Sequence, residues 1–126
     1  MKRTFLILTF TLITAVVMEA QVKLTADSQK TTLEWLGEKV LGNHTGTIRL
    51  QSGWLTMKEN RITGGEFVID MTTIKDVDAN ARLEGHLKSD DFFGVDKFPT
   101  SKLVVKGSDS FDKGSAVVRG DLTIKG

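Results

Sequence analysis

Few side chains in this sequence have the types and the spacing that catalysis requires. A nucleophilic enzyme needs a general base beside its nucleophile, and His44 and His86 are the only histidines available for that role near neutral pH. Neither lies in a Gly-x-Ser-x-Gly motif, and no Cys or His-x-His pair completes a metal site. We therefore expect no catalytic residue and no metal ligand, and we interpret both histidines as loop or cap residues that hydrogen-bond to the backbone.

Two other motifs that resemble functional sites have simpler structural explanations. Asp90 and Asp91 are paired carboxylates, but neighbouring side chains usually point apart, and acidic residues also stabilise helix N-termini. The glycine-rich segment 42–46 lacks the Gly-Lys-Ser/Thr sequence of a phosphate-binding loop, so we predict a turn there. Aromatic and basic residues do not alternate along a strand, which argues against stacking of single-stranded nucleic acid.

The composition excludes several further classes of function. The chain has 126 residues, which allows one domain, and its 17 basic and 16 acidic residues give a net charge of +1. No run of like charges forms a polybasic arm for nucleic acid or for a membrane surface. The absence of cysteine excludes a disulfide scaffold, a thiol nucleophile and every cysteine-based metal site.

The N-terminal segment 1–20 has the features of a cleavable signal peptide. Lys2 and Arg3 precede an apolar stretch, and the small residue Ala20 precedes a polar break. The apolar stretch is shorter than the about 20 residues that a transmembrane helix needs, and an uncleaved N-terminal anchor is the alternative. We expect a periplasmic or secreted protein, with residues 21–126 forming one domain.

Residues 21–126 are predicted to form a succession of short β-strands, which position the histidines and the paired carboxylates described above. Apolar residues recur mostly at every second place, which is the periodicity of a strand with one buried face. Residues 59–60 are expected to form a turn. We predict strands over residues 31–36, 45–51, 54–58, 65–71, 102–106 and 115–125.

One segment, 76–89, departs from this alternation. Leu83 and Leu87 are four residues apart, which places them on one face of a short helix. Asp78 is the expected N-cap, and the aromatic pair 92–93 is expected to point inward after the helix. Several short strands with one helical insert predict a mostly-β fold, an antiparallel barrel or a sandwich.

Several segments in a fixed order resemble the YceI-like family of exported lipid-binding proteins. The most informative segment, 81–99, combines a helix end carrying His-Leu-Lys-Ser with Asp-Phe-Phe, an aromatic-Pro pair and a strand. The C-terminal segment, 118–126, is similar to the family's Gly-Asp/Asn-Leu-Thr-hydrophobe-x-Gly signature. The resemblance covers residues 23–126, and its other segments are 35–40 (WLGEKV), 42–46 (GNHTG), 64–71 (GGEFVIDM) and 118–126 (VRGDLTIKG).

This resemblance implies an all-β fold, an extended antiparallel lipocalin-like β-barrel whose cavity holds a polyisoprenoid or a similar amphiphile. In the family further strands follow the signature, so we expect a chain truncated at its C-terminus and an incomplete barrel. Arg82 and His86, four residues apart on one helix face, are the candidates for contact with a polar headgroup. The candidate cavity residues are Phe67, Ile69, Met71, Leu103, Val105, Val118, Leu122 and Ile124.

These expectations favour a non-enzymatic, exported carrier. Its ligand would be a polyisoprenoid, an isoprenoid quinone or a related amphiphilic lipid, bound by burial of the apolar tail without a covalent step. The alternative is an exported β-rich structural or interaction protein whose alternating apolar residues form a filled core, and an enzyme is the third hypothesis. We expect no cofactor besides a bound isoprenoid lipid and no nucleic-acid partner, while transient membrane contact and a homodimer are compatible with a carrier.

Overall fold

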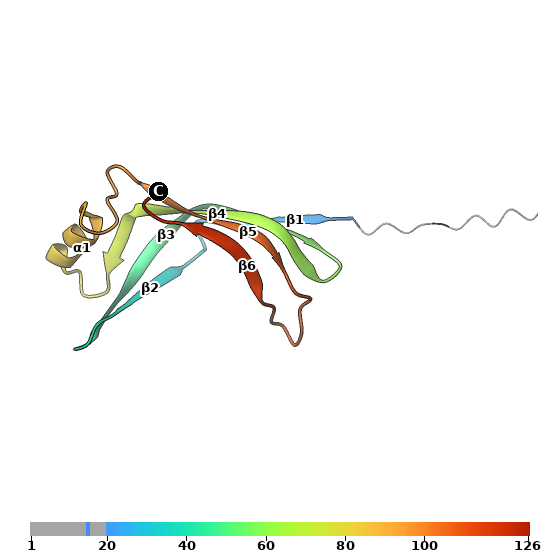
Figure 1. Ribbon diagram of the computed structural model, residues 1–126, viewed down its shortest axis with the longest axis horizontal. Helices are drawn as coiled ribbons and strands as arrows, with labels where there is room; N and C mark the ends of the chain where they lie inside the picture. Colours follow the sequence, from blue (N-terminus) through green and yellow to red (C-terminus); the bar gives the residue numbers. More distant parts are fainter. Residues whose placement is uncertain (1–14, 16–19) are drawn as a thin grey trace, which may run out of the picture.

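Alternating apolar residues build a single curved antiparallel sheet, which has one helix at its end (Figure 1). The computed structural model describes residues 15 and 20–126, so the predicted signal peptide 1–20 lies outside the described residues except at two positions. The elements of the described part are β1 (Val22–Thr25), β2 (Leu33–Glu38), β3 (Asn43–Lys58), β4 (Arg61–Asp76), α1 (Ala81–Lys88), β5 (Thr100–Ser108) and β6 (Val118–Thr123).

The strands β3 and β4, each 16 residues long, form the centre of the sheet. They are joined by Glu59 and Asn60, whose φ angles of 52° and 61° place both residues in the left-handed region. Positive φ at both central residues is the geometry of a type I′ hairpin turn, whose twist matches that of the two strands. The turn predicted at residues 59–60 is therefore confirmed.

The outer strands are arranged unequally on the two sides of this central pair. On one side of β3, β1 pairs with residues 54–57 and β2 with residues 43–48, so β1 and β2 lie toward opposite ends of β3. On the other side, β4, β5 and β6 follow in order. The predicted all-β fold with antiparallel strands and one short helix is confirmed, while the described strands form an open sheet and not a closed lipocalin-like barrel.

A single strand, β3, covers two predicted strands, 45–51 and 54–58. The sequence suggests a break at Gly53, but the strand continues there past a register shift. Gly53 instead leaves room for the ring of Phe67 on β4, because a Cβ atom on Gly53 would lie 2.4 Å from the Phe67 Cδ1 atom. The short strand β1 is absent from the prediction.

Helix α1 begins later than the predicted start at residue 76, because β4 continues to Asp76. The Asp76 Oδ2 atom accepts hydrogen bonds from the N–H groups of Asp78 and Asn80, each at 3.2 Å, and so holds the connection between strand and helix. The N-cap is Asn80, whose Oδ1 atom accepts a hydrogen bond from the Leu83 N–H group at 3.0 Å. The prediction of Asp78 as the N-cap is wrong.

The buried apolar side chains come from β3, β4 and β5, from α1 and from the loop that follows it. None of these side chains is more than 8% exposed, and they form a thin core because one helix covers only one end of the sheet. In the described part of the chain, no helix has both the length and the apolar character needed to cross a membrane. The buried apolar residues are Leu50, Ile62, Met71, Ile74, Leu87, Val95 and Val105.

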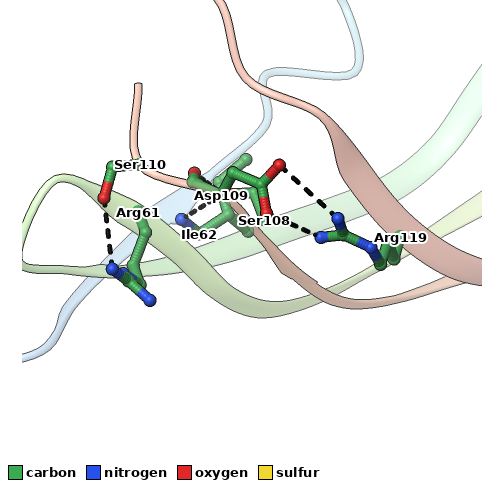
Figure 2. Close-up of polar contacts among 6 residues, drawn as sticks. All are labelled: Arg61, Ile62, Ser108, Asp109, Ser110 and Arg119. Atoms are coloured by element: carbon green, nitrogen blue, oxygen red, sulfur yellow. Dashed lines mark hydrogen bonds and ion pairs between the residues drawn. The ribbon is translucent and has the colours of Figure 1, made fainter. Parts of the chain in front are cut away.

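Hydrogen bonds fasten the sheet at the end opposite α1, where the start of β4 meets the end of β5 (Figure 2). The Ser108 Oγ atom accepts a hydrogen bond from the Ile62 N–H group at 2.8 Å, and the Ser110 Oγ atom accepts one from Arg61 Nη2 at 3.1 Å. Side-chain hydroxyls thus bind groups of β4 that lie beyond its pairing with β5. We call this region, residues 60–62, 108–111 and 119, the polar clamp.

An ion pair completes the polar clamp. The Arg119 Nη1 atom lies 3.0 Å from Asp109 Oδ1 (Figure 2), and both side chains are more than half exposed. The hydrogen bond to Asp109, together with the attraction between the charges, raises the pKa of Arg119 above its ordinary value. Because the guanidinium is already protonated at any physiological pH, this pair orients the two side chains without adding a pH-dependent switch.

Candidate functional site

A pocket of about 400 Å³ lies between α1 and the adjoining ends of β2, β3 and β4. We call it the apolar pocket, because aliphatic and aromatic side chains make up most of its lining. Its volume falls within the range of about 300–1,000 Å³ that is typical of ligand sites. The lining residues are Trp35, Leu36, Gly37, Glu38, Lys39, His44, Ile48, Ile69, Met71, Ile74, Leu83, Leu87, Phe92, Phe93, Ser101 and Ile124.

A bulge in β4 brings two closely spaced apolar side chains to the pocket. Met71 and Ile74 are 5% and 3% exposed and both line it, although their spacing breaks the two-residue alternation of a strand. The register between β3 and β4 shifts next to Arg49, and Thr73 occupies the irregularity. The Thr73 Oγ1 atom accepts a hydrogen bond from the Arg49 N–H group at 2.8 Å and donates one to the Asp70 carbonyl at 2.7 Å. The extra residues therefore redirect Ile74 to the buried face, as bulges commonly do.

Helix α1 and the loop after it cover one side of the pocket. Leu83 and Leu87 lie one turn apart on the same helix face and both line the pocket. The Phe93 N–H group donates a hydrogen bond to the Leu87 carbonyl at 3.0 Å, which fixes the loop against the helix end. The rings of Phe92 and Phe93 meet edge to face, with their centroids 5.8 Å apart. Both phenylalanines line the pocket, but the predicted inward orientation holds only in part, because Phe92 is 46% exposed.

The indole ring of Trp35 forms another wall of the pocket. Its Nε1 atom donates a hydrogen bond to the Lys75 carbonyl at 3.0 Å, so the ring reaches from β2 across β3 to β4. This path requires glycine at position 46, because a Cβ atom there would lie 2.6 Å from the Trp35 Nε1 atom.

The turn predicted over residues 42–46 is wrong for most of its length, since β3 already begins at Asn43.

A second pocket, of about 510 Å³, opens beside the apolar pocket, and we call it the polar mouth. His44 on β3 and Leu83 on α1 line both pockets, so the two adjoin each other. The other residues of the polar mouth are Asn80, Arg82 and His86. The structure therefore brings the predicted headgroup residues Arg82 and His86 together at the edge of the apolar pocket.

The sequence of this chain also matches a known protein family. The sequence model of the YceI-like domain matches residues 24–126, which is most of the chain. The chain belongs to the YceI-like family. A comparison with curated proteins found no match.

Three predicted cavity residues of this YceI-like protein, Ile69, Met71 and Ile124, line the apolar pocket. Strand alternation alone indicates Ile69 and Met71. The four-residue spacing of Leu83 and Leu87 predicted that they share one face of a helix. It did not predict that this face covers a pocket. The aromatic pair 92–93 was predicted to point inward, whereas lining residues such as Trp35 and His44 come from distant segments, whose contacts a single sequence does not indicate.

The other five predicted cavity residues lie farther along the sheet. Phe67, Leu103 and Leu122 are register partners across β4, β5 and β6, in the row next to the pocket. Val105 is 4% exposed one row beyond, where it pairs with Gly65. Val118 and Leu122 are 47% and 58% exposed, because β6 is an edge strand of the described sheet. These residues extend the sheet away from the pocket and do not line it.

Of the two histidines of this YceI-like protein, His86 lies at the helix end that the sequence predicted, whereas His44 lies in a strand and not in the predicted turn. His44 lies within β3 and His86 near the end of α1, and both line the polar mouth. Among the residues that the structure describes, no group of three or more His, Asp or Glu side chains is placed to hold a metal ion. The YceI-like family is known for binding and not for catalysis.

Proposed function

We propose that this protein is a non-enzymatic binding protein that holds the apolar chain of a polyisoprenoid, an isoprenoid quinone or a similar amphiphilic lipid. The observation that carries the proposal is the lining of the apolar pocket, in which aliphatic and aromatic side chains predominate. Each ligand methylene group buried there contributes about 0.8 kcal/mol, so an apolar chain binds without a charged partner. Membership of the YceI-like family supports the same role.

A ligand longer than the apolar pocket would continue along the sheet. Ile69 lines the pocket, and the next cross-strand row consists of Phe67, Leu103 and Leu122. This row offers apolar surface to the distal part of a long tail, while the headgroup stays near the polar mouth. The predicted cavity residues then contact different parts of one extended ligand.

We further propose that the protein works outside the cytoplasm, after export by a signal peptide at residues 1–20. The cationic start and the short apolar stretch of that segment support export. An exported carrier of this kind would exchange its lipid during transient contact with a membrane, and homodimer formation is compatible with that role.

Extraction of the purified full-length protein tests the proposed function. Mass spectrometry of the organic extract should identify an amphiphilic lipid in stoichiometric amount, because a tail buried in the apolar pocket survives purification. Repeated absence of any stoichiometric lipid would overturn the proposal.

A pair of phenylalanine variants locates the bound lipid. Phe93 lines the apolar pocket and Phe111 belongs to the polar clamp, and both are partly buried. Phe93→Ala should lower the amount of lipid per folded protein, while Phe111→Ala should leave it unchanged. An equal loss in both variants would show that the lipid does not depend on the apolar pocket.

A further inference from the structure

The polar mouth contains cationic and hydrogen-bonding groups without a carboxylate. Its lining consists of Arg82, His44, His86, Asn80 and Leu83. Arg82 takes part in none of the ion pairs found among the described residues. The polar mouth therefore offers one guanidinium and two imidazoles to a ligand, and no carboxylate is among its lining residues.

Two acidic residues near Arg82 in the chain, Glu84 and Asp76, have carboxylate oxygens that accept hydrogen bonds from the backbone of the strand–helix connection. The Glu84 Oε1 atom accepts a hydrogen bond from the Asp76 N–H group at 2.9 Å. The Asp76 carboxylate in turn accepts hydrogen bonds from Asp78 and Asn80. None of the ion pairs found among the described residues joins Arg82 to these carboxylates or to Asp78, four residues earlier on the chain.

The geometry also connects the polar mouth with the apolar pocket at the level of single side chains. The His86 ring meets the Phe92 ring edge to face, with their centroids 5.1 Å apart, and Phe92 lines the apolar pocket. Arg82 lies one helical turn before His86, on the same side of α1. A molecule with its tail against Phe92 would thus have its headgroup beside Arg82 and His86.

We propose that the polar mouth selects an anionic headgroup, a phosphate or a carboxylate, with Arg82 as the charge-pairing residue and His44 and His86 as hydrogen-bonding partners. This inference rests on the proposed function, which requires only an apolar tail, and it narrows the ligand class to anionic amphiphiles. A planar guanidinium suits both anions, because its N–H groups match two oxygen atoms at once. Asn80 uses its amide oxygen for the helix cap, so only its amide nitrogen remains to contact a ligand.

Ligands with the same chain and different headgroups test this proposal on the full-length protein. The first pair of probes is farnesyl phosphate and farnesol, and the second is palmitate and hexadecanol. The anionic member of each pair should bind on the order of tenfold more tightly, as expected for a charge-assisted hydrogen bond. Inorganic phosphate is the fifth probe and should bind far more weakly than farnesyl phosphate, because it has no tail for the apolar pocket.

Two variants that remove one positive charge from α1 separate recognition from general attraction. Arg82→Gln should abolish the preference for the anionic probes, because farnesyl phosphate and palmitate lose the guanidinium that pairs with their charge. Lys88→Gln is the matched control, because Lys88 lies on the same helix but does not line the polar mouth. It should keep the preference.

The possible results separate this inference from the proposed function. Equal affinity for the anion and the alcohol in the wild-type protein would overturn the inference while the carrier function stands. A preference that Arg82→Gln and Lys88→Gln reduce equally would also overturn it, as would inorganic phosphate that binds as tightly as farnesyl phosphate. If none of the chain-bearing probes binds, the proposed function itself fails.

Discussion

The two ends of the β3–β4 hairpin are built from different kinds of contact. At the polar clamp, hydroxyl groups such as Ser108 Oγ bind backbone groups of β4, and a two-residue turn closes the hairpin. At the other end, a bulge and helix α1 surround Met71 and Ile74 with apolar side chains and leave a pocket of about 400 Å³. At the polar clamp the polar groups of the strand pair find partners nearby, whereas at the other end part of its apolar face stays uncovered and lines the pocket.

The largest expected effects come from replacing one buried isoleucine at each end of the hairpin with alanine. Ile74 and Ile62 are 3% and 7% exposed, so replacing either with alanine should lower the free energy of unfolding by about 2–5 kcal/mol. Ile74→Ala should also reduce the lipid bound per folded protein, because Ile74 lines the apolar pocket. Urea unfolding and lipid mass spectrometry measure the two effects. If Ile62→Ala loses as much lipid as Ile74→Ala, the two ends do not differ in function.

A smaller effect should follow from removing one hydroxyl of the polar clamp. Ser108→Ala leaves the partly buried Ile62 N–H group without its partner and should cost about 1–3 kcal/mol of stability. Ser110→Ala is the matched control, because its hydroxyl contacts only the exposed Arg61 side chain, and it should change stability by less than about 0.5 kcal/mol. Both variants should retain their lipid. Equal stability losses in chemical denaturation would contradict the role of Ser108.

The smallest expected effect is a gain in stability at the pocket end. Gly85 lies within α1 with no atom near the place of a Cβ, so Gly85→Ala should stabilise the protein by about 0.5–1 kcal/mol. Gly114 has equally open surroundings but a φ angle of 80°, and Gly114→Ala should therefore destabilise. A stiffer α1 should also slow lipid release. Thermal unfolding and release kinetics measure these effects, and a loss of stability in Gly85→Ala would argue against α1 as an ordinary helix.

The sequence predicted those features that depend on local periodicity. Alternation indicated Ile69 and Met71, and helical spacing placed Arg82 and His86 on one face, where the structure indeed finds them at one mouth. Ile74 escaped the prediction because the bulge at Thr73 changes which residues face inward.

Features that depend on distant segments were not predictable from alternation. His44 reaches the polar mouth from β3, and Trp35 meets the carbonyl of Lys75 from a different strand. Alternation predicted Leu122 as a cavity residue in the same way as Ile69 and Met71. Leu122 pairs with Leu103 but is 58% exposed at the sheet edge. Periodicity shows which residues share a face, whereas burial of that face depends on what packs against it.

The placement of the two tryptophans provides an optical measure of occupancy. The chain contains two Trp and no Tyr, so its near-ultraviolet emission comes from indole. Trp35 lines the apolar pocket, whereas Trp54 lies beside Lys23, whose Nζ atom is 4.9 Å from the ring centroid. In a Trp54→Phe protein the remaining fluorescence would originate at the pocket wall, where the polarity around the indole changes when a lipid displaces water. Trp35 is thus an intrinsic fluorophore with which the proposed lipid uptake and release could be measured without a label.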